Sequence, residues 1–186
     1  MKYAKYQHVE RLGCDEVDGI LIGSVCVFPK IDGTNASIYI DEDGEFLTGS
    51  RNRWITPEDD NYGFARWANE NKEQLMGLGV GWHYGESWGQ GIQRKYGLDE
   101  KRFSLFNTGR WKDNPELPIC CHVVPIIFEG IFDTNNIELA LDNLKQRGSY
   151  ASPEFMKPEG IVIFQKAGQN LFKKTIEKDE APKGTN

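Results

Sequence analysis

The sequence has no long hydrophobic run, and this absence sets the first limits on function. No segment approaches the ~18 consecutive apolar residues of a membrane-spanning helix, and residues 1–11 are polar, unlike a signal peptide. Basic residues are also in deficit, because 28 acidic side chains outweigh 22 basic ones and give a net charge of −6. This excludes a generally basic nucleic-acid coat, although a local basic face remains compatible with the average. We expect a cytoplasmic, monomeric protein that does not enter the membrane.

Cysteine and histidine are too few, and too irregularly spaced, for a structural metal site. No pair of cysteines has the C-x-x-C spacing of a zinc site, and the three histidines are scattered. Two cysteines are adjacent, which is poor geometry for a disulfide with each other. We therefore expect four reduced thiols, at Cys14, Cys26, Cys120 and Cys121.

The common glycine-rich nucleotide motifs are missing as well. Gly79-x-Gly81 and Gly89-x-Gly91 begin such patterns, but neither continues as a dinucleotide fingerprint or a P-loop. No internal repeat or low-complexity linker is present. With 12% aromatic and 27% charged residues among 186, the chain is globular. We expect one domain over residues 1–177 and a flexible tail over residues 178–186.

The pattern of apolar residues predicts more strands than helices. An acidic turn at residues 41–44 lies between two strand-like runs and indicates a hairpin, and residues 90–98 predict a mobile polar loop. Because regular βαβ alternation is missing, we predict an α+β fold with mainly antiparallel sheets and flanking helices. Helices are expected at residues 63–76 and 134–147, and strands at residues 20–28, 35–39, 45–48, 82–86, 102–107, 122–128, 160–165 and 171–176.

The segment with the strongest functional signal is Phe28-Pro29-Lys30-Ile31-Asp32-Gly33-Thr34-Asn35. Apolar runs on both sides predict strands, so Lys30 is expected at a strand end, where a rigid scaffold can hold a reactive group. Alone, the octapeptide is also compatible with a surface turn that carries a solvated lysine. Other charged residues interrupt apolar strands farther along the chain, at Arg51, Glu86, Glu159, Lys173 and Lys174. Each of them alone could be a solvated charge at the end of a strand, but that explanation does not account for the whole ordered set.

Taken together, these segments resemble the covalent nucleotidyltransferases, which are the ATP-dependent DNA and RNA ligases and the mRNA capping enzymes. Six motifs occur in family order between residues 30 and 175, and the forms of the first and third are most similar to RNA ligases of the RNA-ligase-2 type. The motifs are Lys30-Ile31-Asp32-Gly33-Thr34-Asn35, Ser50-Arg51, Tyr84-Gly85-Glu86-Ser87-Trp88-Gly89, Phe103-Ser104-Leu105-Phe106-Asn107, Glu159-Gly160-Ile161-Val162 and Phe172-Lys173-Lys174-Thr175.

The resemblance implies a reaction in three steps on a lysine. Lys30 attacks the α-phosphate of ATP, AMP passes from the lysine to a 5′-phosphate end, and a 3′-hydroxyl then attacks that end. A protonated lysine cannot attack, so nearby positive charge from a metal, Lys173 or Lys174 would favour the neutral amine. Beyond that, the chemistry requires mainly positioning and charge neutralisation.

The resemblance also assigns the remaining roles. Asp32 and Asn35 would orient the nucleophile and hold metal-bound water or phosphate, and Glu86 would bind the ribose or organise metal-bound water. Arg51 would contact phosphate, for which its planar fork is suited. Phe106 would stack on adenine, whereas Phe103, at odd spacing in a strand, should face the other way.

The resemblance also implies a divalent metal, with Glu159 and Asp32 as its candidate ligands. Hard oxygen ligands favour Mg²⁺ or Mn²⁺.

The fifth motif departs from the family pattern, in which two lysines are separated by one residue and share a strand face. Here Lys173 and Lys174 are adjacent, so strand alternation sends them to opposite faces. Aligned on Thr175, Lys174 matches the second family lysine, and we favour it for the site. A bulge would allow both.

The resemblance leaves the substrate open. No OB-fold or other C-terminal domain is expected in residues 178–186. The leading hypothesis is an ATP-dependent RNA ligase acting in RNA repair on RNA or nicked nucleic-acid ends. The alternatives are a small ATP-dependent DNA ligase, and a nucleotide-binding domain that has lost turnover.

Overall fold

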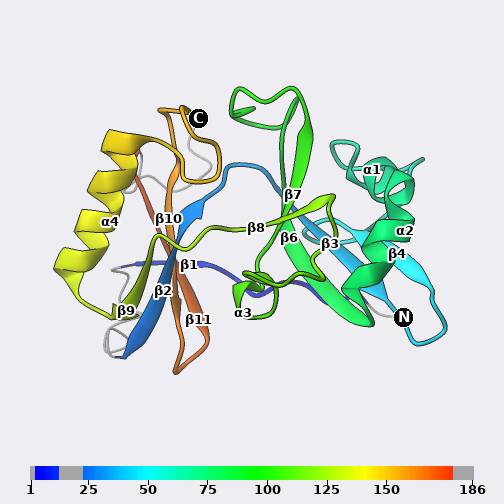
Figure 1. The fold of residues 1–186 in the computed structure, drawn as a ribbon, viewed down its shortest axis with the longest axis horizontal. Helices are drawn as coiled ribbons and strands as arrows, with labels where there is room; N and C mark the ends of the chain where they lie inside the picture. The colour runs from blue at the N-terminus through cyan, green and yellow to red at the C-terminus, as the bar shows by residue number, and fades with distance from the viewer. Residues whose placement is uncertain (1–2, 13–22, 178–186) are drawn as a thin grey trace. The chain divides into compact units, whose positions relative to one another are not determined.

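The computed structural model describes residues 3–12 and 23–177, which form two compact units (Figure 1). Among the described residues, the sheet A unit comprises residues 7–12, 23–31 and 125–177, and the sheet B unit comprises residues 3–6 and 32–124. Each unit has its own sheet with mainly antiparallel strands, and helices are few. The predicted α+β class is therefore confirmed. The expected tail lies outside the described residues.

The sheet A unit is a five-stranded sheet covered on one face by a helix. The strand order is β1–β11–β10–β2–β9; β1 pairs with β11 in parallel, and the other pairs are antiparallel. Its elements are β1 (Glu10–Arg11), β2 (Ser24–Lys30), β9 (Phe128–Ile131), α4 (Thr134–Arg147), β10 (Gly160–Gln165) and β11 (Asn170–Thr175).

Helix α4 forms where the sequence predicts it, because its start, its apolar face and its end are all encoded locally. The Asp133 side chain caps the first turn by accepting a hydrogen bond from the Asn135 N–H at 2.7 Å. Apolar side chains at three-and-four spacing pack against the sheet. Gly148, at φ 83°, ends the helix. The buried residues of this cluster are Val25, Val27, Ile137, Ala140, Leu141, Leu144, Ile161, Ile163 and Phe172.

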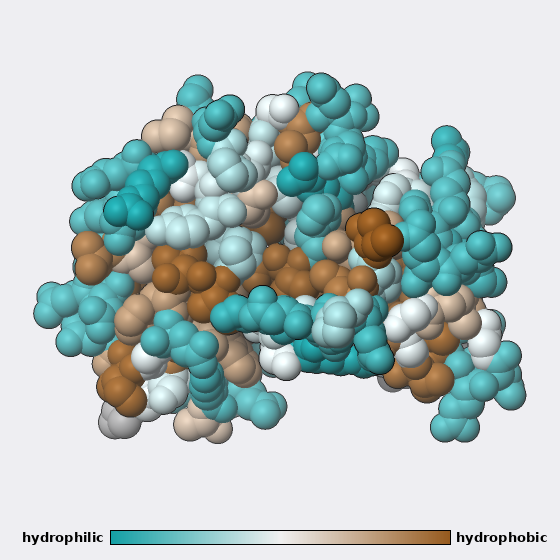
Figure 2. Space-filling view, viewed as in Figure 1, coloured by the Kyte–Doolittle hydropathy of each residue, from teal (hydrophilic) through white to brown (hydrophobic). Residues whose placement is uncertain are grey.

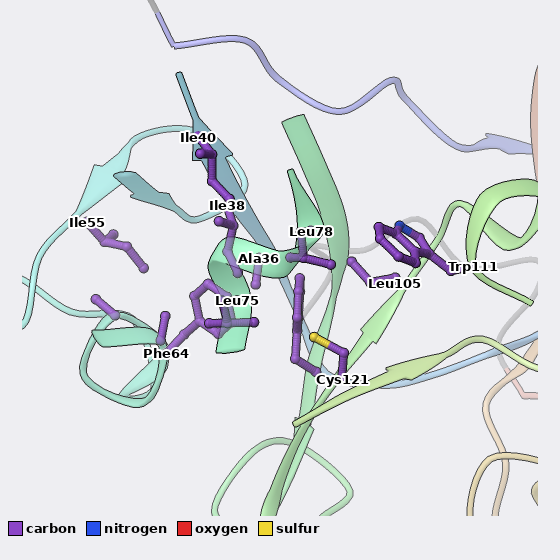
Figure 3. Packing of buried hydrophobic residues seen from close by; sticks show 13 residues of the cluster. Ala36, Ile38, Ile40, Ile55, Phe64, Leu75, Leu78, Leu105, Trp111 and Cys121 are labelled. Carbon is purple, nitrogen blue, oxygen red and sulfur yellow. The ribbon is translucent and has the colours of Figure 1, made fainter. Parts of the chain in front are cut away.

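The sheet B unit is a six-stranded sheet in the order β5–β4–β3–β6–β7–β8. Two short helices and a 3₁₀ turn pack on one face, and Figure 3 shows Ala36 and Ile38 of β3 in that core together with Phe64 and Leu75. The elements are β3 (Thr34–Ile40), β4 (Phe46–Gly49), β5 (Trp54–Ile55), α1 (Phe64–Glu70), α2 (Lys72–Leu75), η2 (Met76–Leu78), β6 (Gly81–Gly89), β7 (Lys101–Leu105), α3 (Thr108–Trp111) and β8 (Cys121–Val123).

The exposed sides of the helices are polar, as their sequence patterns require. Figure 2 shows mostly hydrophilic residues over α1 and α2, and also over the outer side of α4. Within the described ranges, every helix is too short or too polar to cross a membrane. Three of the four cysteines, Cys26, Cys120 and Cys121, are free thiols, and Cys14 lies outside the described residues.

The predicted hairpin at residues 41–44 is confirmed by the pairing of β3 with β4, and two other predictions need correction. The helix expected over residues 63–76 is broken at Asn71, whose side chain bonds back to the Trp67 carbonyl at 2.8 Å and competes with the helix. The single strand expected over residues 122–128 is instead β8 and β9, in different sheets. Pro125 lies between them and has no N–H to donate to a ladder.

The face of sheet B opposite its core carries a row of aromatic rings. Trp82 stacks on Trp54, with ring centroids 5.1 Å apart and planes 15° apart, and on Tyr84 at 5.3 Å and 3°. Tyr6, from the N-terminal segment, continues the row, 5.1 Å from Tyr84 and 5.0 Å from Phe106. We call these five residues the aromatic row. Their ring contacts fix the N-terminal segment to the sheet.

Polar contacts reinforce this attachment. The Tyr3 hydroxyl donates to the Ser50 carbonyl, and its ring meets Trp54 edge-on at 5.0 Å. The Tyr84 hydroxyl donates to the Ala4 carbonyl at 2.9 Å. Residues 3–6 are therefore an integral part of the sheet B unit.

A first prediction concerns the core under α4. Leu144 is fully buried, whereas Leu139, on the same helix, is 60% exposed. Leu144→Ala should lower the free energy of unfolding by about 2–5 kcal/mol, because it removes buried methyl groups and leaves a cavity. Leu139→Ala is the matched control and should change it by less than about 0.5 kcal/mol. Urea unfolding measures both, and equal losses would contradict the packing described.

A second prediction concerns alkaline pH. Burial is the main cause that raises the pKa of Tyr6 to about 12, with Tyr84 adding to it. In the unfolded chain the Tyr6 hydroxyl loses its proton near pH 10, whereas in the folded chain it keeps it until about pH 12. The stabilisation that this difference contributes is therefore fully present below about pH 10 and is lost as the pH rises above it. By pH 11 the expected loss is about 1 kcal/mol. Tyr6→Phe should remove this loss when the free energy of unfolding is measured with urea between pH 9 and 11. If that free energy falls equally with pH in both proteins, the prediction is wrong.

Candidate active site

Lys30 is the last residue of β2 and lies beside the fourth motif. In the antiparallel ladder it is paired with Gly160, the first residue of β10, and Glu159 directly precedes that strand. The Lys30 Nζ donates to Glu159 Oε2 at 2.5 Å, and the two side chains are 21% and 10% exposed. The lysine is therefore at a strand end, as predicted, and its amine is held by a carboxylate in a nearly enclosed position.

The turn that begins at Gly33 is fixed by Glu86. The Gly33 N–H donates to Glu86 Oε1 at 3.1 Å, and the Asn35 amide donates to Glu86 Oε2 at 3.0 Å. A Cβ on Gly33 would lie 2.3 Å from the Ser87 carbonyl oxygen, so the turn has room only for glycine there. Glu86 thus connects the first and third motifs with both of its carboxylate oxygens.

Asp32 is held by the loop that follows β6. Its Oδ2 accepts a hydrogen bond from Arg94 Nε at 2.9 Å, and its N–H donates to the Tyr96 hydroxyl at 2.7 Å. The sequence predicts a mobile loop around Arg94, so it does not predict this contact. A basic residue in a loop gives no sign of a partner 62 positions away.

A shallow hollow on the open face of sheet B brings other candidate residues together. Asn35, Arg51 and Phe106 line it, and Arg51 is exposed to solvent. Phe103 instead lies in the core on the opposite face, fully buried, as its odd spacing from Phe106 predicts. The other lining residues are Tyr3, Tyr6, Ala36, Ser37, Ser50 and Tyr84.

Sequence reasoning missed the part played by Tyr3, Tyr6 and Tyr84. Tyr6 packs on Phe106, the residue expected to stack on adenine, and Tyr3 bonds to the carbonyl of Ser50, next to Arg51. One signal was available, because two tyrosines three residues apart stand out in an otherwise polar opening segment. Their target on the sheet, however, is set by contacts of long sequence range.

The register of β11 places its two lysines on opposite faces, and it favours Lys173 where the sequence favours Lys174. Lys173 pairs with Val162, which in turn pairs with Phe28, and directly paired residues share a sheet face. Because alternate residues of β2 share a face, Lys173 lies on the face of Lys30. Lys174 points to the other face, where its Nζ donates to Glu138 of α4. The ladder of β10 with β11 is continuous, so no bulge brings both lysines to one side.

The two residues expected to hold a metal differ in how well their surroundings suit a cation. Among the described residues, no three His, Cys, Asp or Glu side chains gather in a cluster. Mg²⁺ and Mn²⁺ fit a site with one or two carboxylates, because substrate phosphates and water supply the other oxygens. Glu159 offers such a carboxylate. Asp32 fits less well, because the Arg94 guanidinium beside it would repel a cation.

Solved structures of known proteins share this fold. Naegleria gruberi RNA ligase, as a mutant with ATP and Mn, matches with a TM-score of 0.71 and 20% identity over 93% of this chain and 56% of that one. A mutant of the same ligase in the apo form matches with a TM-score of 0.70 and 21% identity, over 92% and 55%. A further mutant with AMP and Mn gives 0.69 and 21%, over 93% and 56%. The chain therefore spans about half the length of these ligases.

Sequence comparison is more specific than the fold. No curated protein sequence matches the chain. The family model described as RNA ligase, however, matches residues 23–175, which include all six motifs and most of the chain. By that match, this protein belongs to the RNA ligase family, within the nucleotidyltransferase superfamily.

Proposed function

We propose that this chain is the nucleotidyltransferase part of an ATP-dependent RNA ligase, in which Lys30 carries AMP between ATP and RNA. The observation that carries the proposal is the setting of Lys30. Its amine is at a strand end, enclosed, and 2.5 Å from the Glu159 carboxylate. A lysine that serves only solubility would extend into water, and strand ends on a rigid sheet are where a reacting group is best positioned.

In the first step, the neutral Lys30 amine attacks the α-phosphorus of ATP, an N–P bond forms, and the bond to the pyrophosphate oxygen breaks. The ammonium must first lose a proton, and Glu159 Oε2 is in position to accept it and pass it to water, which leaves the carboxylate ionised again. When bound, Mg²⁺ or Mn²⁺ supplies charge neutralisation on the phosphates. Glu159 is the residue best suited to hold that cation.

In the second step, an oxygen of the RNA 5′-phosphate attacks the lysyl-AMP phosphorus, and the N–P bond breaks to release Lys30. In the third, the RNA 3′-hydroxyl attacks the activated 5′-phosphate and AMP leaves. Both steps are substitutions at phosphorus, the first an adenylyl transfer and the second the formation of a phosphodiester; the released lysine amine takes up a proton and the attacking hydroxyl gives one up to water. They depend on positioning and on positive charge. Arg51 and Lys173 are the cations that we assign to these phosphates.

The base of ATP is assigned to the hollow on sheet B. Phe106 offers an aromatic face there, and base–aromatic stacking contributes about 1–3 kcal/mol per base. Asn35 and the exposed Arg51 on the same rim supply an amide and a guanidinium for the ribose and phosphate. Tyr6, in ring contact with Phe106, supports the stacking residue from the N-terminal side.

The decisive prediction is covalent labelling. Incubation with α-³²P-ATP and Mg²⁺ or Mn²⁺ should leave label on the wild-type protein, and Lys30→Ala and Lys30→Arg should abolish it. The matched control is Lys166→Ala, which removes a lysine of the same unit that is paired with Glu129 on the exposed surface; it should label normally. Absence of label on the wild type would end the enzyme proposal, and ATP binding without label would identify a domain that has lost turnover.

The same labelled protein tests the substrate. Addition of a nicked RNA duplex should transfer the label to its 5′-phosphate end, and a nicked DNA duplex of the same sequence should accept less. A stronger transfer to DNA would replace the RNA proposal with a small DNA ligase.

The two lysines of the fifth motif give a separate prediction. Lys173→Ala should lower the labelling rate by about 10²-fold, the order seen when a charge-stabilising donor is removed from an active site. Lys174→Ala removes a partly exposed pair with Glu138 and should cost at most about 1 kcal/mol of stability and little activity. Single-turnover labelling at saturating ATP measures both, and a larger loss in Lys174→Ala would restore that residue as the active lysine.

A further inference from the structure

The loop over residues 90–98, which connects β6 to β7, has an unusual backbone. Gln93, Lys95 and Tyr96 have φ angles of 42°, 61° and 52°, in the left-handed region that non-glycine residues seldom adopt. Each such residue costs on the order of 1 kcal/mol, and it persists only where the surroundings impose it. Three of them within four positions show that this conformation is imposed, although polar composition alone predicts a mobile loop.

Two buried side chains hold the loop in this conformation. Ile92 is fully buried and Tyr96 is only 3% exposed. The Tyr96 ring meets Trp88 of β6 edge-on at 5.0 Å, and the Trp88 indole N–H donates to the Ser104 hydroxyl at 2.9 Å. Backbone turns close the loop from inside, with Ile92 N–H donating to the Gly89 carbonyl at 3.1 Å. The loop is therefore a packed element of the sheet B unit.

Two contacts of this element end on one residue. Arg94 holds the side chain of Asp32 through Nε, and Tyr96 holds its backbone N–H. The left-handed conformations on either side of Arg94 allow the chain to reverse and present residues 94 and 96 to the same target. Both Arg94 and Asp32 are little more than a quarter exposed, so this pair is less screened by water than a surface pair.

Asp32 lies two residues after Lys30 in the sequence, directly before the turn that Glu86 holds. We propose that Arg94 and Tyr96 are positioning residues that fix Asp32 for the reaction, a role that rests on the proposed function. With Arg94 in place, Asp32 acts as an oriented hydrogen-bond acceptor in the motif of the nucleophile and not as a ligand of the divalent cation. The strain in the loop is retained because it brings both contacts to this one position.

A positioning residue acts through the residue that it positions, so the effects of substitutions at Arg94 and at Asp32 should be coupled. Arg94→Ala should slow the same step of the reaction as Asp32→Asn, by about 10- to 100-fold, the order expected when a group shifts by roughly 1 Å. In the Asp32→Asn background, Arg94→Ala should cause at most about a twofold further loss. Non-additivity of this kind identifies residues that act as a unit.

The experiment measures two rates, lysine labelling from α-³²P-ATP and transfer of the label to nicked RNA, at saturating substrate. Arg94→Lys should recover part of the loss, because a cation remains near Asp32. Tyr96→Phe keeps the ring on Trp88 but removes the acceptor of the Asp32 N–H, and it should affect the same step. Half-maximal Mg²⁺ concentrations should be unchanged in Arg94→Ala and Asp32→Asn, since neither residue is assigned to the cation.

Arg102→Ala is the matched control. Arg102 Nε donates to Glu100 Oε1 at 2.8 Å, and its guanidinium lies over the Trp88 ring at 5.7 Å, so the variant removes an arginine–carboxylate pair beside the same loop and perturbs the packing on Trp88 while leaving both contacts to Asp32 in place. It should keep at least half of the wild-type rates. Circular dichroism and thermal unfolding verify that each variant is folded; if Arg94→Ala unfolds, Arg94→Lys and Tyr96→Phe carry the test.

The outcomes separate the two proposals. If the wild type takes no label, the proposed function fails and this inference fails with it. If the wild type is labelled but Arg94→Ala equals Arg102→Ala, or its effect is additive with Asp32→Asn, only the inference is overturned. A raised Mg²⁺ requirement in Asp32→Asn would also overturn it, because it would make Asp32 a ligand of the cation.

Discussion

The carboxylate of Glu86 is the interaction on which the candidate site in the sheet B unit depends. It lies in the middle of β6, 8% exposed, where a strand side chain would normally be apolar or would face water. Burial of a charge is costly unless hydrogen bonds compensate for it, and here the Gly33 N–H and the Asn35 amide do so. The first motif and the third are far apart in the sequence, but they are one structure because of this carboxylate.

The open face of the same sheet explains why the site is built there. One face of β3 and β6 is covered by the apolar core against α1 and α2, so the other face is available for polar and aromatic groups. Asn35 and Glu86 lie on it as a directly paired couple, and Ser37 and Tyr84 form the next pair. The aromatic row then continues away from these polar residues. The strand alternation that makes a core on one side therefore makes a polar and aromatic surface on the other.

Local signals in the sequence predicted much of this, and long-range contacts account for the rest. The strand end at Lys30, the acidic hairpin and helix α4 depend on neighbouring residues, and each was predictable. The division of residues 122–128 between two sheets was not, because the apolar pattern continues across it and only Pro125 interrupts it. The contact of Arg94 with Asp32 and the packing of Tyr6 on the sheet could not be predicted at all, since no residue near them in the sequence indicates these partners. Strand alternation predicts opposite faces for the adjacent lysines at 173 and 174, but only the register shows that no bulge intervenes and which lysine shares the face of Lys30.

The charges in this structure also bear on the divalent cation that we propose for the reaction. Two of the basic side chains near the first motif are paired with carboxylates, Lys30 with Glu159 and Arg94 with Asp32. In the proposed reaction a triphosphate would bring several negative charges toward groups that are close to neutral as pairs, so these side chains would attract it only weakly. A divalent cation held near these residues would therefore add positive charge to that of Arg51 and Lys173, the side chains we assign to the phosphates. Glu159 would then have two roles in the proposed reaction, because its carboxylate holds the Lys30 amine in this structure and would offer an oxygen ligand to the cation.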